Sequence, residues 1–228
     1  MKLENLMTSR QGTAMNLSKE EYEERMLAKT MKALEDELRE KRKKRTESMI
    51  EASGLSTAIK NMTFESFKAD EEWKAKMKSM AEEYARNPSG WIVFCGQSGS
   101  GKTHLCTAIA GRLMKERLIP VTYMLWRQDY FRATGFDSEE YRNTLRKCEC
   151  LYIDDLFKGA APEKQLGLAF DILDARYREK KLTIISTELS MNEIGEVDEA
   201  LWGRMKQMAK GHIVGIKKER GRNQRIEQ

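Results

Sequence analysis

The sequence predicts an α/β fold in which a parallel sheet is flanked by helices, with a helical arm ahead of it. Two observations indicate the sheet. A glycine-rich motif directly follows the apolar run 91–95, and further short apolar runs recur between charged helical stretches. That alternation is typical of βαβ units. A third observation, a long charged stretch with one apolar stripe near the beginning of the chain, indicates the arm.

Composition limits the classes of protein to consider. With 228 residues, the chain can form one α/β domain with a full core and a smaller appendage. No long apolar stretch suits a membrane span, and residues 1–12 lack the apolar segment of a signal peptide. We therefore expect a soluble, cytoplasmic protein with no membrane contact. Its four cysteines suit buried thiols rather than disulfides or zinc, and its net charge of +5 permits nucleic-acid contact without requiring it.

Residues 1–55 are predicted to form the arm. Ser18 and Glu21 match a capping box, which predicts that a helix begins there. The apolar stripe of this helix consists of Leu27, Met31, Leu34 and Leu38. Such a stripe can pair in a coiled coil, fold back on the main domain or bind a partner, and we favour a partner or a second copy because the stripe is isolated. The basic run 41–45 suits either DNA phosphates or a solvated helix end.

Residues 56–228 are predicted to form the main domain. Turn residues and apolar periodicity place its elements along the chain. The expected helices are 71–86, 104–118 and a short one at 198–205, and the expected strands are 91–95, 121–126, 150–153, 183–186 and 212–216.

The glycine-rich segment matches the P-loop pattern G-x-x-x-x-G-K-[ST]. Its residues are Gly96, Gln97, Ser98, Gly99, Ser100, Gly101, Lys102 and Thr103, and His104 continues them into the predicted helix. In this motif backbone N–H groups surround phosphates, the lysine reaches the β- and γ-phosphates, and the hydroxyl binds Mg²⁺. Strand, loop and helix follow in the required order, which argues against a chance glycine-rich turn. We expect ATP and Mg²⁺ as cofactors.

Two carboxylates end the predicted strand 150–153, where open α/β sheets present residues to ligands. This is a Walker B pattern, although an Asp-Asp turn is the ordinary alternative. Asp154 is expected to bind Mg²⁺ and Asp155 to polarise the water that attacks the γ-phosphorus. Because Asp155 is one methylene shorter than glutamate, we expect slow hydrolysis.

Two further residues are candidates for catalysis. Thr187 ends the strand 183–186, where its hydroxyl would orient the attacking water or, alternatively, cap the helix near Asn192. Arg204 lies in the short helix before the last strand. It suits either an arginine finger that acts on a neighbouring subunit or a surface salt bridge.

The motifs at 63–67, 99–105 and 151–156 together resemble the DnaC/DnaI/IstB group of AAA+ ATPases, from about residue 50 to the end of the chain. The resemblance implies a loader of the replicative DNA helicase or a helper of a transposase. It also implies Thr187 as sensor 1, Arg204 as the inter-subunit arginine finger, and single-stranded DNA contact within a ring or spiral homo-oligomer. Arg222 is the best candidate for sensor 2.

For DNA contact, the basic and aromatic stretch 126–132 is the candidate, and the buried edge of a strand-to-helix connection is its alternative. The leading hypothesis for function is an ATP-hydrolysing helicase loader whose arm binds the helicase, and the short chain suits a phage or mobile element. An IstB-like transposition helper and an adaptor switched by ATP with little hydrolysis remain open. A small-molecule kinase is disfavoured because no arginine-rich lid segment follows the Walker B strand.

Overall fold

The computed structural model describes residues 19–219, 222 and 223, and the chain divides into two compact units, Met1–Lys44 and Arg45–Gln228. Ser18 of the expected capping box lies outside the described residues. The helix expected after it is present as α1 (Lys19–Ser53). Among the described residues, no helix is both long and apolar enough to cross a membrane.

The first unit presents the predicted apolar stripe on its helix. The exposed fractions are 64% for Leu27, 51% for Met31, 50% for Leu34 and 57% for Leu38. Tyr22 and Met26 are exposed as well, with fractions of 59% and 45%. The side chains of this unit that the structure describes are thus all accessible to solvent.

The second unit begins before the predicted boundary at residue 55. Met49 and Ile50, near the end of α1, pack against the core of this unit. Leu55 is buried, and so is Ile59 of the short helix α2 (Ser56–Asn61). Apolar side chains therefore attach the end of α1 to the main domain, and the boundary at residue 55 stays a prediction.

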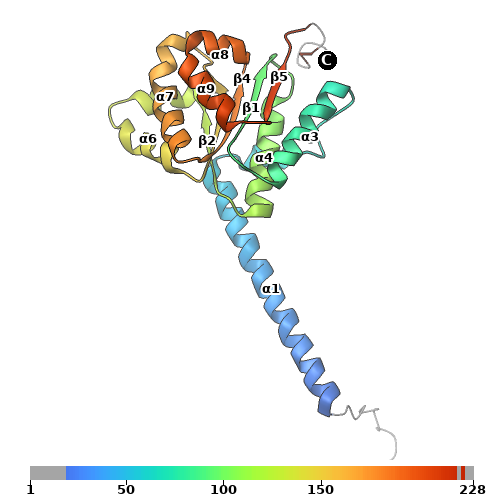
Figure 1. The fold of residues 1–228 in the computed structure, drawn as a ribbon. Helices are drawn as coiled ribbons and strands as arrows, with labels where there is room; N and C mark the ends of the chain where they lie inside the picture. Colours follow the sequence, from blue (N-terminus) through green and yellow to red (C-terminus); the bar gives the residue numbers. More distant parts are fainter. Residues whose placement is uncertain (1–18, 220–221, 224–228) are drawn as a thin grey trace, which may run out of the picture. The chain divides into compact units, whose positions relative to one another are not determined.

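Five strands of the second unit form a parallel sheet in the order β2-β3-β4-β1-β5 (Figure 1). The strands are β1 (Trp91–Gly96), β2 (Val121–Leu125), β3 (Cys150–Leu156), β4 (Leu182–Thr187) and β5 (Ile213–Ile216). Each corresponds to a strand predicted from an apolar run. The structure confirms the predicted fold class.

Helices cover both faces of the sheet, and side chains alternate between two cores (Figure 1). Ile92 and Phe94 of β1 face one core, while Val93 and Cys95 face the other. The first face is covered by α2, α3 (Glu72–Arg86) and α4 (Lys102–Arg117). The second core is completed by α5 (Trp126–Thr134), α6 (Ser138–Lys147), α7 (Pro162–Arg178), α8 (Met191–Val197) and α9 (Glu199–Met208).

The strand order determines which loops meet. Since β4 lies between β1 and β3, and all strands run in the same direction, the carboxyl ends of these three strands lie along one edge of the sheet. The P-loop follows β1, and Asp154 and Asp155 lie near the end of β3. In open α/β sheets this edge is where ligands bind. The four cysteines are free; Cys95, Cys106 and Cys150 are buried as expected, and Cys148 is half-buried.

Candidate functional site

The P-loop connects β1 directly to α4, as the sequence predicts. Gly96 and Gly101 both have positive φ, +104° and +91°. A Cβ atom at Gly96 would lie 2.0 Å from the carbonyl oxygen of Ile216, and one at Gly101 would lie 2.6 Å from the ring of Phe67. Only glycine fits both the backbone angles and the space, so these positions require glycine to keep the loop in this conformation.

Lys102, the first residue of α4, lies inside the curve of this loop. Its side chain is buried, and its Nζ donates hydrogen bonds to the carbonyl oxygens of Gly96 and Gln97 at 2.9 and 2.6 Å. Burial lowers the pKa of Lys102, and carboxylates nearby, Glu188 and Asp155, oppose that shift. Because both of these acceptors are neutral, the buried ammonium is well placed to gain from an anionic ligand.

Asp154 connects the Walker B strand to the P-loop helix. Its Oδ1 accepts hydrogen bonds from Thr103 Oγ1 at 3.0 Å and from Ser186 Oγ, and its Oδ2 accepts one from the hydroxyl of Tyr123 at 3.3 Å. The carboxylate is buried, with 3% of Asp154 exposed. Its position is therefore set by donors from three elements, α4, β4 and β2.

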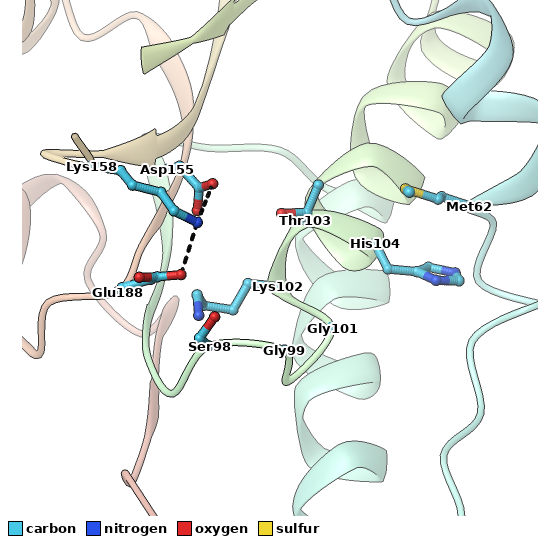
Figure 2. Close-up of a pocket in the computed structure, with 10 residues that line it drawn as sticks. All are labelled: Met62, Ser98, Gly99, Gly101, Lys102, Thr103, His104, Asp155, Lys158 and Glu188. Carbon is cyan, nitrogen blue, oxygen red and sulfur yellow. Dashed lines mark hydrogen bonds and ion pairs between the residues drawn. The ribbon is translucent and has the colours of Figure 1, made fainter. Parts of the chain in front are cut away.

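A cavity opens beside this cluster (Figure 2). It is lined by Met62, Ser98, Gly99, Gly101, Lys102, Thr103, His104, Asp155, Lys158 and Glu188. Lys158 Nζ lies 3.0 Å from Asp155 Oδ2 and 2.9 Å from Glu188 Oε1. Although desolvation raises the pKa of Glu188, hydrogen bonds from Lys158 and Ser98 lower it overall. The P-loop and Asp155 thus meet in one cavity that contains two lysines, and Asp154 lies buried beside it.

Comparisons with known proteins agree with this geometry. The family model of the bacterial DnaA ATPase domain matches residues 59–211. The chain belongs to this family. The match runs from within α2 to just beyond the end of α9 and includes the P-loop and both Walker B carboxylates. The DnaC-type AAA+ resemblance noted in the sequence is confirmed.

Sequence alignments with three related proteins each cover about three quarters of this AAA+ chain. It is 33% identical over 199 residues to the uncharacterized protein YqaM of Bacillus subtilis, covering 78% of this chain and 62% of YqaM. It is 29% identical over 190 residues to the phage-like element PBSX protein XkdC of the same organism, covering 76% of this chain and 71% of XkdC. It is 28% identical over 177 residues to the replicative helicase loader DnaC of Escherichia coli, covering 74% and 72%.

Solved structures share the fold of this AAA+ chain. A DnaC helicase loader aligns with a TM-score of 0.61 and 20% identity, covering 71% of this chain and 99% of that one. DnaI aligns with a TM-score of 0.57 and 18% identity, covering 73% and 92%. The replication initiator DnaA bound to AMPPCP and single-stranded DNA aligns with a TM-score of 0.56 and 22% identity, covering 69% of this chain and half of that one.

Thr187 does not reach the cavity of this AAA+ domain. It is fully buried, and its hydroxyl donates to the carbonyl oxygen of Leu156 at 2.9 Å and accepts from the N–H of Leu189 at 3.2 Å. Side chains alternate along β4, so Ser186 faces α4 whereas Thr187 faces the opposite core. The geometry therefore does not support the expected orientation of the attacking water by Thr187, and its catalytic role stays a prediction. Its hydroxyl joins the ends of β3 and β4 instead.

The two candidate arginines also lie outside the cavity. Arg204 Nε pairs with Asp174 at 2.8 Å, and the guanidinium lies over the rings of Phe170 and Tyr177. The salt bridge that was the alternative for Arg204 is therefore present within the subunit. Arg222 lies over Trp73, with its guanidinium 5.4 Å from the ring centroid, and pairs with Glu219. The roles of arginine finger and sensor 2 stay predictions.

His104 attaches the segment 63–67 to the P-loop helix. Its Nε2 lies 2.8 Å from the carbonyl oxygen of Thr63 and 3.2 Å from Ser66 Oγ, and its ring makes an edge contact with Phe67. The ring points away from Lys102 and Asp155, towards the side of Met62 (Figure 2). His104 thus orders the rim of the site, and direct contact with nucleotide stays a prediction.

Within the stretch 126–132, one residue fits the buried strand-to-helix connection and others fit a surface for DNA contact. Trp126 is fully buried and its indole donates to Gln165, as the buried-edge alternative expects. Arg127 and Arg132 are exposed on the same helix, and Phe131 is 74% exposed. A basic and aromatic surface therefore remains on α5 for a ligand in solution.

Sequence reasoning missed four residues that shape the site: Tyr123, Lys158, Ser186 and Glu188. Tyr123 and Ser186 lie on predicted strands and donate to Asp154, whereas Lys158 and Glu188 line the cavity, and none of these contacts was predicted. Strict alternation along β4 places Ser186 on the face of Ile184, which packs beneath α4. That signal was available in the sequence.

Proposed function

We propose that this chain is a DNA replication protein that binds and hydrolyses ATP at the P-loop and loads the replicative helicase onto single-stranded DNA. The observation that carries the ATPase part is the junction of Thr103 with Asp154, with Lys102 and Asp155 in the adjoining cavity. This is the donor and carboxylate set that hydrolysis of a nucleoside triphosphate requires. The similarity to the replicative helicase loader DnaC supports the replication part.

The residues present fit ATP with Mg²⁺. The P-loop offers backbone N–H groups and Lys102 to the phosphates. Thr103 and Asp154 would hold Mg²⁺, because a hydroxyl, a carboxylate and phosphate oxygens are the hard ligands that this ion prefers. The ion would supply positive charge to the phosphate oxygens. Asp155, at the rim of the cavity, would accept a hydrogen bond from the attacking water and orient it.

Asparagine at Asp155 is expected to slow phosphate release about 100-fold while ATP binding is kept, since the amide is a poor base of similar shape. Steady-state phosphate release together with equilibrium ATP binding measures both effects. Asp137→Asn is the matched control, because Asp137 is an exposed carboxylate outside the cavity. Full turnover of Asp155→Asn would remove Asp155 from the reaction. Full loading without turnover would instead favour the adaptor switched by ATP.

Helicase binding is assigned to the arm, because α1 presents exposed apolar side chains on an otherwise charged helix. Such a helix suits a groove on a partner protein. We expect Leu27→Glu with Leu34→Glu to weaken binding of the full-length chain to the replicative helicase by more than about tenfold, since both anchors would carry charge into an apolar contact.

The control for this arm variant is Lys29→Glu with Lys32→Glu, which alters the other side of the helix and changes the net charge more strongly. Immobilised helicase and labelled full-length chain give both affinities. Equal binding by the stripe variant and the wild type would contradict the assignment of the arm. Capture of a transposase in place of the helicase would favour the IstB-like alternative.

DNA contact is assigned to α5, where Arg127, Phe131 and Arg132 are exposed. Arginines attract phosphates and an exposed ring can stack on a base, which is the usual combination for single strands. Phe136, fully exposed beyond the end of α5, extends this surface.

The arginine-finger role of Arg204 requires a second subunit, so a ring or spiral homo-oligomer is part of the proposal.

A further inference from the structure

The turn after the Walker B strand has an unusual backbone. Asp155 and Phe157 have positive φ, +58° and +67°, although neither is glycine, and Gly159 follows with φ +107°. Such angles are sparsely populated for residues with a Cβ and persist only where the surroundings hold them. The register between β3 and β4 also shifts here, between Ile153 and Leu156. The chain therefore adopts a strained path at this edge of the cavity.

Buried contacts hold this turn in place. Phe157 is buried, and its ring packs edge-on against Trp126, with the centroids 5.9 Å apart. Gln165 donates to the carbonyl oxygens of Phe157 and Ala160. The indole of Trp126 donates to the amide oxygen of the same Gln165. The turn is thus held by a ring contact and by a hydrogen-bonded amide.

One consequence of this path is the position of Lys158. Its backbone N–H donates to the carbonyl oxygen of Asp155 at 3.0 Å, and its side chain extends along the cavity between Asp155 and Glu188 (Figure 2). The side chain is 33% exposed, so its ammonium faces the open cavity. Although burial opposes the charge, hydrogen bonds to Glu188 and Asp155 raise the pKa of Lys158. It is charged at neutral pH.

The ammonium of Lys158 therefore lies where it can contact both a bound phosphate and the carboxylate of Asp155. Its ammonium is a second cation in the cavity that contains Lys102, and it pairs with the carboxylate expected to orient water. Glu188 accepts from Lys158 on one side and from Ser98 of the P-loop on the other. A phosphate beside Ser98 would compete with both carboxylates for the ammonium, because a terminal phosphate carries more charge and more acceptor oxygens than a carboxylate.

We propose that Lys158 binds the terminal phosphate of a nucleoside triphosphate in the P-loop and, in doing so, releases Asp155 to orient water. The proposal rests on the proposed ATP site. In this proposal the ammonium of Lys158 leaves the carboxylates of Asp155 and Glu188 and contacts the γ-phosphate. The γ-phosphate is then recognised by a residue of the same subunit. A diphosphate has no terminal group at that position, so Asp155 would stay paired with Lys158.

The test compares affinities for two nucleotides in the full-length chain. Equilibrium titrations with ADP and with AMPPCP, an ATP analogue that is not hydrolysed, are made for the wild type, Lys158→Ala, Lys158→Arg and the exposed-surface control Lys210→Ala. We expect Lys158→Ala to weaken AMPPCP binding about tenfold or more, because one charge-assisted contact is lost, while ADP binding changes less than about twofold. Lys158→Arg should keep most of the wild-type ratio of AMPPCP affinity to ADP affinity, and Lys210→Ala should keep all of it.

The outcomes separate this proposal from the ATP site itself. Unchanged ADP binding by Lys158→Ala shows that the variant is folded. An equal loss of both nucleotides, or no loss of either, would overturn the role of Lys158 while the ATP site stands. If the wild type bound neither nucleotide, the proposed function and the role of Lys158 would both be wrong.

Discussion

Lys102→Ala is expected to abolish ATP binding and to reduce phosphate release below about one-thousandth of the wild-type rate. Lys102 is the buried cation inside the P-loop, and its ammonium donates hydrogen bonds to the neutral carbonyl oxygens of Gly96 and Gln97. Triphosphate would give it charged acceptors, and electrostatic stabilisation of this kind is the main source of catalysis in phosphoryl transfer. Equilibrium ATP binding and steady-state phosphate release measure the two effects.

The control for this variant is Lys115→Ala, which removes an exposed lysine near the other end of the same helix. We expect it to bind ATP as the wild type does. Because Lys102 is buried, thermal unfolding of both variants is needed to show that each is folded. A folded Lys102→Ala variant with wild-type ATP binding would show that the P-loop does not bind the phosphates in the proposed way.

Arg176→Met is expected to lower the free energy of unfolding by about 4 kcal/mol or more. Arg176 is a fully buried arginine of α7. Its guanidinium donates hydrogen bonds to Thr183 Oγ1 and to the carbonyl oxygens of Leu145, Arg146, Cys148 and Leu182. Methionine has a similar length but no donor, so several buried acceptors would lose their partner, and each such loss costs about 1–3 kcal/mol.

Arg178→Met is the matched control for Arg176→Met, because Arg178 lies on the same helix. Its side chain is 72% exposed, and it forms an ion pair with Asp174. An exposed pair contributes less than about 1 kcal/mol, so this variant should unfold at nearly the wild-type denaturant concentration. Denaturant unfolding of both variants gives the comparison. A similar, small loss for both would mean that Arg176 does not connect α6 to β4 in the folded state.

The sequence predicted most of the fold because its signals are local. Each strand is a contiguous apolar run, and helices such as 71–86 and 104–118 show apolar periodicity that needs no partner to be recognised. The domain boundary at residue 55 stays a prediction, because its position depends on contacts that are not local. Whether a residue such as Met49 or Ile50 joins the arm or the core depends on contacts with distant parts of the chain. No local pattern near residue 55 contains that information.

Sequence alone determined the P-loop, the two Walker B carboxylates and the positions of the strands along the chain, since each is a contiguous motif or run. Tertiary structure decided which side chains meet at the site. Alternation along β4 sets the face of Ser186, but only the pairing of β3 with β4 brings it to Asp154, and Glu188 and Lys158 meet because β3 shifts its register and turns through positive φ. Such contacts depend on the pairing and packing of segments about thirty residues apart, which local spacing does not specify.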